Sequence, residues 1–170
     1  MTDACYLAEL GNVGPGSLVT VGGDEGRHAA VVKRTRVGET VLVADGQGQA
    51  IRGEVVEVTK GSISVRVGEL LTEPEQSLRW TAVQALAKGE RSDIAVESLT
   101  ELGASRIVAW QAARSIVRWD AKADKGLTKW QATARESTKQ SRRFRVPQVT
   151  YATTRQVEQL IAGAALALIC

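Results

Sequence analysis

Basic side chains and one aromatic ring gather in residues 135–147, the strongest chemical signal in the sequence. Five of these thirteen residues are basic and one is acidic. On a helix, Arg135, Lys139 and Arg142 fall on one face, because residues three and four apart are neighbours there. Such cations suit a phosphate backbone, and Phe144 among them suits stacking on an unpaired base. The alternative is a solvated helix face whose arginines pair with local carboxylates.

Two smaller basic clusters each follow a predicted strand. Lys88 and Arg91 stand where a strand meets a helix, a junction whose free backbone N–H groups attract anions. Arg114 and Arg118 follow the next strand, at its carboxyl end. The alternatives are a plain turn for the first cluster and loop packing over buried tryptophans for the second.

A fourth basic group surrounds the single histidine. His28 and Arg34 lie on a predicted short helix and can face a nucleic acid, although a lone histidine is more often a structural hydrogen-bonding residue. The sequence contains no nucleophile motif, no phosphate-binding loop and no dinucleotide fingerprint. One His and two Cys do not build a standard zinc site, so no metal is expected.

Charge is distributed unevenly over the 170 residues, whose net charge is +3. Residues 1–72 carry seven basic and nine acidic side chains, whereas residues 73–170 carry fifteen and ten. Hydrophobic residues make up 44% of the chain, enough for a buried core, and no apolar run is long enough to span a bilayer. The start of the chain does not resemble a signal peptide, and Cys5 and Cys170 are expected to be reduced thiols in the cytoplasm, although a disulfide between them is conceivable.

The elements that position these groups differ between the two halves. Short β-rich segments at residues 17–21, 40–44, 50–59 and 62–67 alternate with Gly-containing turns, and residues 25–36 read as a short helix. This pattern favours a small β-barrel, because closure removes exposed strand edges. Residues 73–78 are polar, contain Pro74 and are the predicted linker.

After the linker, predicted strands alternate with helices, which implies a parallel sheet. Strands are expected at residues 79–86 and 106–110, and helices at 92–102, 127–141 and 156–161. The first helix is expected to start at Ser92 or Asp93 and to bury Ala95, Leu99 and Leu102, with Gly103 just past its end. Residues 165–170 read as a buried parallel strand, beyond whose carboxyl end a ligand would bind.

Taken together, these stretches resemble the RsmE family of 16S ribosomal RNA methyltransferases. The matching segments are residues 23–25 leading to His28, 32–34, Gly38, 45–46, 84–91, 100–103, 114–115 and 139–147. The resemblance implies a PUA-like β-barrel over residues 1–72 and, over residues 79–170, the start of an α/β SPOUT domain that carries a trefoil knot in the family.

The resemblance also implies an activity. Family members act as homodimers and transfer the methyl group of S-adenosylmethionine to N3 of a uridine in 16S ribosomal RNA, within the small ribosomal subunit. The RNA-binding candidates are His28, Arg34, Lys88, Arg91, Arg114, Arg118, Arg135, Lys139, Gln140, Ser141, Arg142, Arg143 and Arg145. At the margin of the cofactor pocket the candidates are Leu168, Ile169 and Cys170. No catalytic residue is assigned.

Several features depart from the family pattern. The Gly-Pro-Glu-Gly-Gly loop and the Leu-Arg-Thr-Glu stretch, which form the knot and cofactor pocket in the family, do not occur in these 170 residues. Lys139 replaces a usual acid, and Arg142 replaces a commonly small residue. We therefore expect this chain alone neither to bind the cofactor tightly nor to methylate RNA. The other hypotheses are a module that grips ribosomal RNA without chemistry and an α/β interaction protein with no RNA role.

Overall fold

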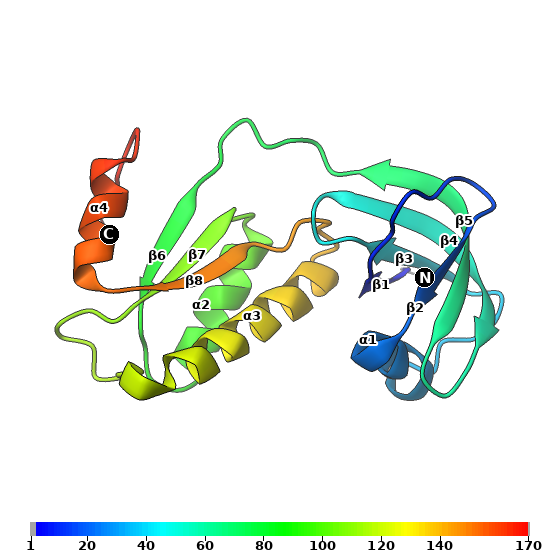
Figure 1. Ribbon diagram of the computed structural model, residues 1–170, viewed down its shortest axis with the longest axis horizontal. Coiled ribbons are helices and arrows are strands. Elements are labelled where there is room, and N and C mark those ends of the chain that lie inside the picture. The colour runs from blue at the N-terminus through cyan, green and yellow to red at the C-terminus, as the bar shows by residue number, and fades with distance from the viewer. Residues whose placement is uncertain (1–2, 170) are drawn as a thin grey trace. The chain divides into compact units, whose positions relative to one another are not determined.

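A computed structural model describes residues 3–169, which form two compact units (Figure 1). One unit holds the chain up to Gln76 together with the return segment Thr138–Val146. The other holds Ser77–Ser137 and the chain from Pro147 onward. The sequence predicts this return segment to be part of the second domain, whereas it packs with the first unit.

The first unit is a curled five-stranded sheet, a half-barrel (Figure 1). Its strands are β1 (Ala4–Leu7), β2 (Leu18–Val21), β3 (Thr40–Ala44), β4 (Gln49–Val58) and β5 (Ile63–Thr72), in the order β1-β3-β4-β5-β2. β1 runs parallel to β3, and the other pairs are antiparallel. β1 was not predicted. Within residues 3–169, β1 and β2 do not pair with each other, so the closure expected of a barrel stops at these two edges.

Alternation along the strands builds the core of the first unit. Val41, Val43, Ile63 and Val65 are almost fully buried on one face, as the period of two predicts. The helix α1 (Gly23–Arg27) and the π-helical turn η1 (His28–Val32) cover the predicted helical region. Beneath them, the Tyr6 hydroxyl and the Thr35 Oγ1 form a buried hydrogen bond of 2.7 Å.

The second unit contains a parallel sheet in the order β6-β7-β8. β6 (Thr81–Ala85), α2 (Glu90–Glu101), β7 (Arg106–Trp110), the short 3₁₀ turn η2 (Asp120–Lys122), α3 (Ala123–Gln140), β8 (Gln148–Ala152) and α4 (Thr154–Ala162) follow along the chain. Because the strands are parallel, their carboxyl ends meet at one edge of the sheet. β8 was not predicted.

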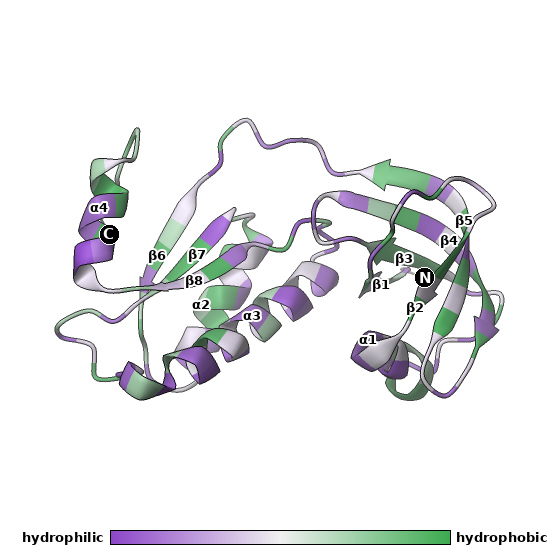
Figure 2. Cartoon of the chain, in the orientation of Figure 1, coloured by the Kyte–Doolittle hydropathy of each residue, from purple (hydrophilic) through white to green (hydrophobic). Residues whose placement is uncertain are grey.

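The strands of this sheet contain many apolar residues (Figure 2), and their side chains pack on both faces, in keeping with a parallel sheet. On one face, Ile107 and Ala109 pack with Trp130 of α3 and Val96 of α2. On the other, Val108 packs with Ala152 and with Val157 of α4. Among the residues described, no helix is long and apolar enough to cross a membrane.

The start of α2 was predicted wrongly, and its buried face was predicted only in part, since Leu99 packs against the core as expected. The helix begins at Glu90, with Gly89 as its N-cap, and the Ser92 hydroxyl donates to the Ala87 carbonyl instead of capping. Val96 and Thr100 are buried, whereas Leu102 is 72% exposed. Leu102 is the C-cap, where the chain leaves the helix, so it does not continue the buried face.

The buried strand predicted at residues 165–170 is also wrong for the part described. Residues 164–169 form no strand and are exposed, with Leu166 at 76% and Leu168 at 80%. A buried strand requires a neighbouring strand to satisfy its backbone groups, and the pairings among residues 3–169 do not include this segment. Apolar composition alone therefore did not place it in the sheet.

Two glycines on neighbouring strands give a matched test of the first unit. A Cβ on Gly53 would lie 2.2 Å from the Arg66 carbonyl oxygen, which is backbone and cannot rotate away. We expect Gly53→Ala to destabilise the protein by at least about 2 kcal/mol in chemical denaturation, because the strands must separate. A Cβ on Gly68 would lie 3.4 Å from its nearest neighbour, so Gly68→Ala should change stability by less than about 0.5 kcal/mol. Equal effects would contradict this packing.

Candidate nucleic-acid interface

The return segment Thr138–Val146 is bound to the first unit by backbone and side-chain contacts. Val146 N–H donates to the Gly46 carbonyl at 2.9 Å, and Gly48 N–H donates to the Phe144 carbonyl at 3.0 Å. The Arg145 guanidinium donates to the Gln47 carbonyl and lies over Gly48, where a Cβ would collide with it. Gly48 also has φ +114°, so the close approach of Arg145 depends on glycine there.

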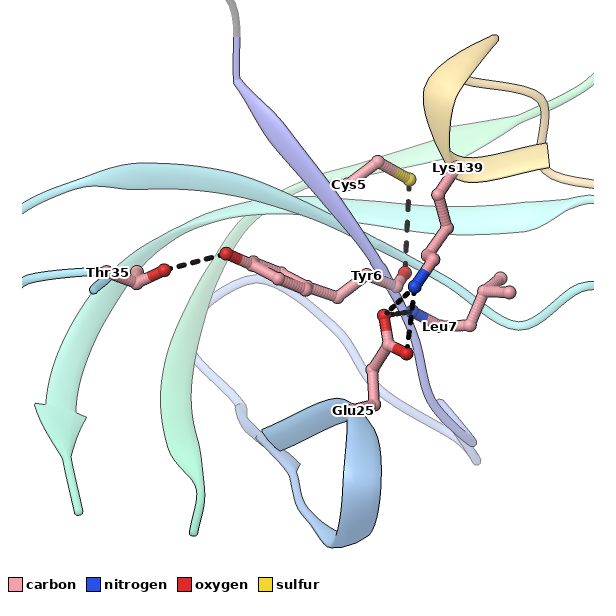
Figure 3. A network of polar contacts seen from close by, with 6 residues as sticks. All are labelled: Cys5, Tyr6, Leu7, Glu25, Thr35 and Lys139. Carbon is pink, nitrogen blue, oxygen red and sulfur yellow. Dashed lines mark hydrogen bonds and ion pairs between the residues drawn. The ribbon is translucent and has the colours of Figure 1, made fainter. Parts of the chain in front are cut away.

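The deepest contact of the return segment is an ion pair between Lys139 and Glu25 (Figure 3). Lys139 Nζ lies 3.0 and 3.1 Å from the two carboxylate oxygens, and the two side chains are only 5% and 18% exposed. The same carboxylate accepts a hydrogen bond from Leu7 N–H at 3.3 Å. Lys139, predicted to bind RNA, therefore has its charge compensated inside the protein.

A second carboxylate, that of Glu73, holds the next turn of the return segment. Arg143 donates to one oxygen at 2.9 Å, and the backbone N–H of Phe144 donates to the other at 2.8 Å. Phe144 is half-buried and packs against the small cluster of Leu7, Ala44 and Ala50. The pairing of arginines with local carboxylates, which was the alternative reading of this stretch, thus describes Arg143 in addition to Lys139.

Other predicted RNA-binding residues of this stretch remain at the surface. Arg135, Gln140 and Arg142 are exposed, and Ser141 is half-buried. Arg142 follows the last turn of α3 with φ +55°. In the first unit, Arg34 is also exposed and adopts a left-handed backbone conformation, with φ +54°, whereas His28 is half-buried.

The parallel sheet brings a different set of predicted cations together. Lys88 and Arg91 follow β6, and Arg114 and Arg118 follow β7, so all four lie at the carboxyl edge, and all four are exposed. Arg155, an exposed residue near the start of α4, follows β8 at the same edge. It was missed because β8 itself was not predicted; the alternating Gln148–Ala152 before a Thr cap was the available signal.

The loop after β7 is organised by Gln111. Its amide donates to the Asp120 carboxylate at 2.9 Å, and its carbonyl oxygen accepts from Trp119 N–H at 2.7 Å. The Arg118 guanidinium lies 3.6 Å from the same carboxylate, but both side chains are mostly exposed and the pair is weak. Arg118 therefore stays available to a ligand.

Tryptophan packing fixes the inner side of this loop. Trp119 stacks with Tyr151 and meets Trp130 edge-on, with ring centroids 5.9 and 5.5 Å apart. A Cβ on Gly126 would lie within 2.4 Å of the Trp119 ring, so glycine in α3 makes room for it. This is the tryptophan packing given as the alternative for the 114–118 cluster, and it coexists with two exposed arginines.

Arg135 does not share the carboxyl edge. α3 starts beside that edge, after β7, and leads back toward the start of β8. At 1.5 Å per residue, Arg135 lies roughly 18 Å along the helix from Ala123. The predicted cations therefore do not form one ridge: some gather at the carboxyl edge, and others lie toward the far end of α3.

The margin of the cofactor pocket is not built by the residues described. Leu168 and Ile169 are 80% and 92% exposed and belong to no strand, and Cys170 lies outside the described residues. The carboxyl edge itself presents cations, which suit phosphate better than a positively charged sulfonium. These residues do not fit a closed site for S-adenosylmethionine. Among residues 3–169, no group of His, Cys, Asp or Glu is placed to hold a metal ion.

Cys5 lies beside the ion pair and is a free thiol (Figure 3). The pKa of Cys5 is raised to about 11, mainly by burial; Lys139 and Arg142 lower it, and Glu25 adds to the rise. Burial also raises the pKa of Tyr6, against its hydrogen bond from Thr35. Neither group is poised to act as a nucleophile near neutral pH.

Comparison with known proteins identifies the family. Residues 74–170 match the model of an RNA methyltransferase domain, and residues 21–68 match that of an RNA methyltransferase PUA domain. The chain is 42% identical over 158 residues to the ribosomal RNA small subunit methyltransferase E of Mycobacterium bovis. The chain belongs to the RsmE family of RNA methyltransferases. The aligned region covers 89% of this RsmE-family chain but 60% of that relative.

Other relatives agree with this assignment. The Bacillus subtilis methyltransferase E is 32% identical over 132 residues, which are 76% of this chain and 52% of the relative. A methyltransferase E from Neisseria gonorrhoeae, solved bound to S-adenosyl methionine, superposes with a TM-score of 0.81 at 26% identity, covering 92% of this chain and 64% of that one.

A putative methyltransferase from Legionella pneumophila, solved in complex with bound SAM, superposes with a TM-score of 0.82 at 23% identity. The superposition covers 99% of this chain and 69% of that one, and at this identity it supports the fold only. The predicted fold class, a PUA-like β-domain followed by an α/β SPOUT-type domain, is confirmed.

The buried ion pair predicts a large stability loss on truncation. Lys139→Ala leaves the Glu25 carboxylate mostly buried without its ammonium, and we expect a loss of about 3 kcal/mol in denaturant unfolding. Lys129→Ala is the matched control, because Lys129 Nζ also lies 2.8 Å from a carboxylate, that of Asp93, but its side chain is 64% exposed. That variant should lose less than about 1 kcal/mol. Similar losses in the two variants would refute a special role for burial.

The raised pKa of Cys5 predicts slow alkylation and a stability loss in alkali. At pH 8 the folded thiol should react with iodoacetamide about a hundredfold more slowly than the unfolded one, read by mass spectrometry of the Cys5 peptide. Between pH 9 and 11 the unfolded thiol ionises while the folded one stays protonated, so this contribution to stability falls as pH rises through that window. Equal alkylation rates would show that the thiol is not shielded.

Proposed function

We propose that this protein serves the S-adenosylmethionine-dependent methylation of N3 of a uridine in 16S ribosomal RNA of the small subunit. The observation that carries the proposal is the family match over residues 74–170, on a parallel sheet whose carboxyl edge gathers Lys88, Arg91, Arg114 and Arg118. Open α/β sheets bind ligands at that edge. Methyltransferase E of Mycobacterium bovis, aligned over 89% of the chain, supports the same reaction class.

The carboxyl-edge cations suit the demands of this reaction. The N3–H of uracil is a weak acid, and positive charge near the base favours its deprotonated form. Guanidinium groups also bind phosphate in a bidentate manner and can hold the flanking nucleotides. Arg114 and Arg118 follow β7, the central strand of the sheet, and therefore lie near the middle of its carboxyl edge. We assign them to holding RNA near the reacting base.

The cofactor supplies the electrophilic methyl group when bound. The described residues do not enclose it, and the proposal assigns none of them to its adenosine or sulfonium. Homodimerisation, a trefoil knot, a cytoplasmic location and the domain limits 1–72 and 79–170 belong to the same proposal. They are supported by the resemblance to the RsmE family and, for the PUA-like domain, by the match over residues 21–68.

Disruption of the coding gene in its host tests the function. We expect N3-methyluridine to disappear from 16S ribosomal RNA, measured by mass spectrometry of its nucleosides. Complementation with these 170 residues alone should not restore it, and calorimetry should show no micromolar binding of S-adenosylmethionine to the chain. Persistence of N3-methyluridine after disruption would refute the proposed function, whereas micromolar cofactor binding would refute only the inactivity of this chain.

A further inference from the structure

Two arginines end helical segments in the left-handed backbone conformation. Arg34 follows η1 with φ +54°, and Arg142 follows α3 with φ +55°. Only a few per cent of non-glycine residues adopt positive φ, and Asn and Asp are enriched among them. Within residues 3–169 the one other such residue is Asp120, of a type that tolerates this conformation. The two arginines are therefore the positions where residue type and backbone disagree.

The end of α2 shows what this fold does elsewhere at the same position. There, Gly103 takes the left-handed conformation, with φ +84°, directly after the C-cap Leu102. Glycine is the usual residue at such a position, because an L side chain crowds the following carbonyl. The same protein thus ends one helix with the favoured residue and places arginine after α3 and η1.

Tertiary contacts hold both arginines in this conformation. After α3, Arg142 N–H donates to the Lys139 carbonyl at 3.2 Å and Arg143 N–H to the Thr138 carbonyl at 3.0 Å, which is the Schellman pattern. After η1, Thr35 N–H donates to the Ala29 carbonyl at 3.1 Å, and its side chain is fixed on Tyr6. The residues on either side dictate the turn, and the arginine side chains do not.

The side chains of these arginines hold no other residue of the fold in place, although the charge of Arg142 lowers the pKa of Cys5. Both residues are exposed, and within residues 3–169 neither guanidinium forms a hydrogen bond or an ion pair. By contrast, Arg143 is bound to Glu73 and Arg145 to the Gln47 carbonyl. Both left-handed arginines belong to the first compact unit.

We propose that Arg34 and Arg142 occupy these unfavourable positions because their guanidinium groups contact phosphates of the folded ribosomal RNA, an inference that rests on the proposed function. An exposed, unpaired guanidinium supplies a fork of donors that matches a phosphate, and a backbone turn fixed by its neighbours limits the directions it can take. Binding of RNA is gained here at the expense of stability.

Substitution by glycine separates the two effects. Arg34→Gly and Arg142→Gly should each raise the melting temperature, by about 2–4 °C, because they remove backbone strain. Each should also reduce the slope of log binding constant against log salt by about 0.7–0.9, measured with purified small ribosomal subunits, the substrate of the proposed reaction. Arg34→Lys and Arg142→Lys keep both the charge and the strain, and should leave the melting temperature and the slope near those of the unaltered chain.

Arg143→Ala is the matched control for loss of charge. Because Arg143 is held by Glu73, its removal should lower the melting temperature and change the salt slope less than Arg142→Gly does. An unaltered slope in both glycine variants, with salt-dependent binding by the unaltered chain, would overturn this inference alone. Absence of salt-dependent binding by the unaltered chain would overturn it together with the RNA-binding part of the proposed function. A lowered melting temperature in both glycine variants would overturn the strain argument.

Discussion

The buried carboxylate of Glu25 determines how the most basic stretch of the chain is used. A carboxylate this poorly hydrated is stable only if a cation and hydrogen-bond donors replace its water. Lys139 Nζ and Leu7 N–H provide them, and Glu73 plays the same part for Arg143 and the backbone of Phe144. Because these two carboxylates lie on the half-barrel, the residues after α3 must return to it. The conformation of the left-handed Arg142 follows from that return.

The basic residues of the first unit therefore fall into two groups, those bound to protein groups and those exposed to solvent. Lys139 and Arg143 are paired with carboxylates, which compensate their charge, and Arg145 is held by the Gln47 carbonyl. Arg34 and Arg142 in the same unit project outward without such partners among residues 3–169. Clustering of arginines in a sequence therefore does not measure the charge available to RNA. The number of local carboxylates and their burial decide how much of it remains.

In the second unit the constraint is the parallel sheet. Parallel strands need crossover helices, and the crossovers place every strand's carboxyl end at one edge. Loops after β6, β7 and β8 are thereby gathered although they are far apart in the sequence, and each brings at least one exposed cation. The packing of Trp119 on Tyr151 and over Gly126 supports the middle loop from inside, while Arg114 and Arg118 remain outside. A well-packed base with exposed cations above it is a suitable surface for a polyanion.

Local sequence signals predict the fold class, most strands and helices, and the family, because hydrophobic period, turn residues and ordered motifs do not depend on distant contacts. β3 and β7 were predicted at their observed limits, and Gly103 marked the end of α2. β1 and β8 were missed because Ala4–Leu7 and Gln148–Ala152 are short and become strands through pairing with β3 and β7. Residues 164–169 are the opposite case: their apolar pattern predicted a strand, but no neighbouring strand pairs with them among the residues described.

Which of the basic side chains lack a protein partner depends on tertiary contacts. Glu25 and Lys139 are more than a hundred residues apart in the chain, so their contact could not be predicted from sequence spacing. Because of this contact, Lys139, which was predicted to bind RNA, is a structural residue of the first unit. Positive φ at Arg34 and Arg142 was equally hidden, because it is imposed by hydrogen bonds of neighbouring residues. Residue type fixes the charge of a side chain, but burial and partners, which depend on the whole fold, fix what that charge can bind.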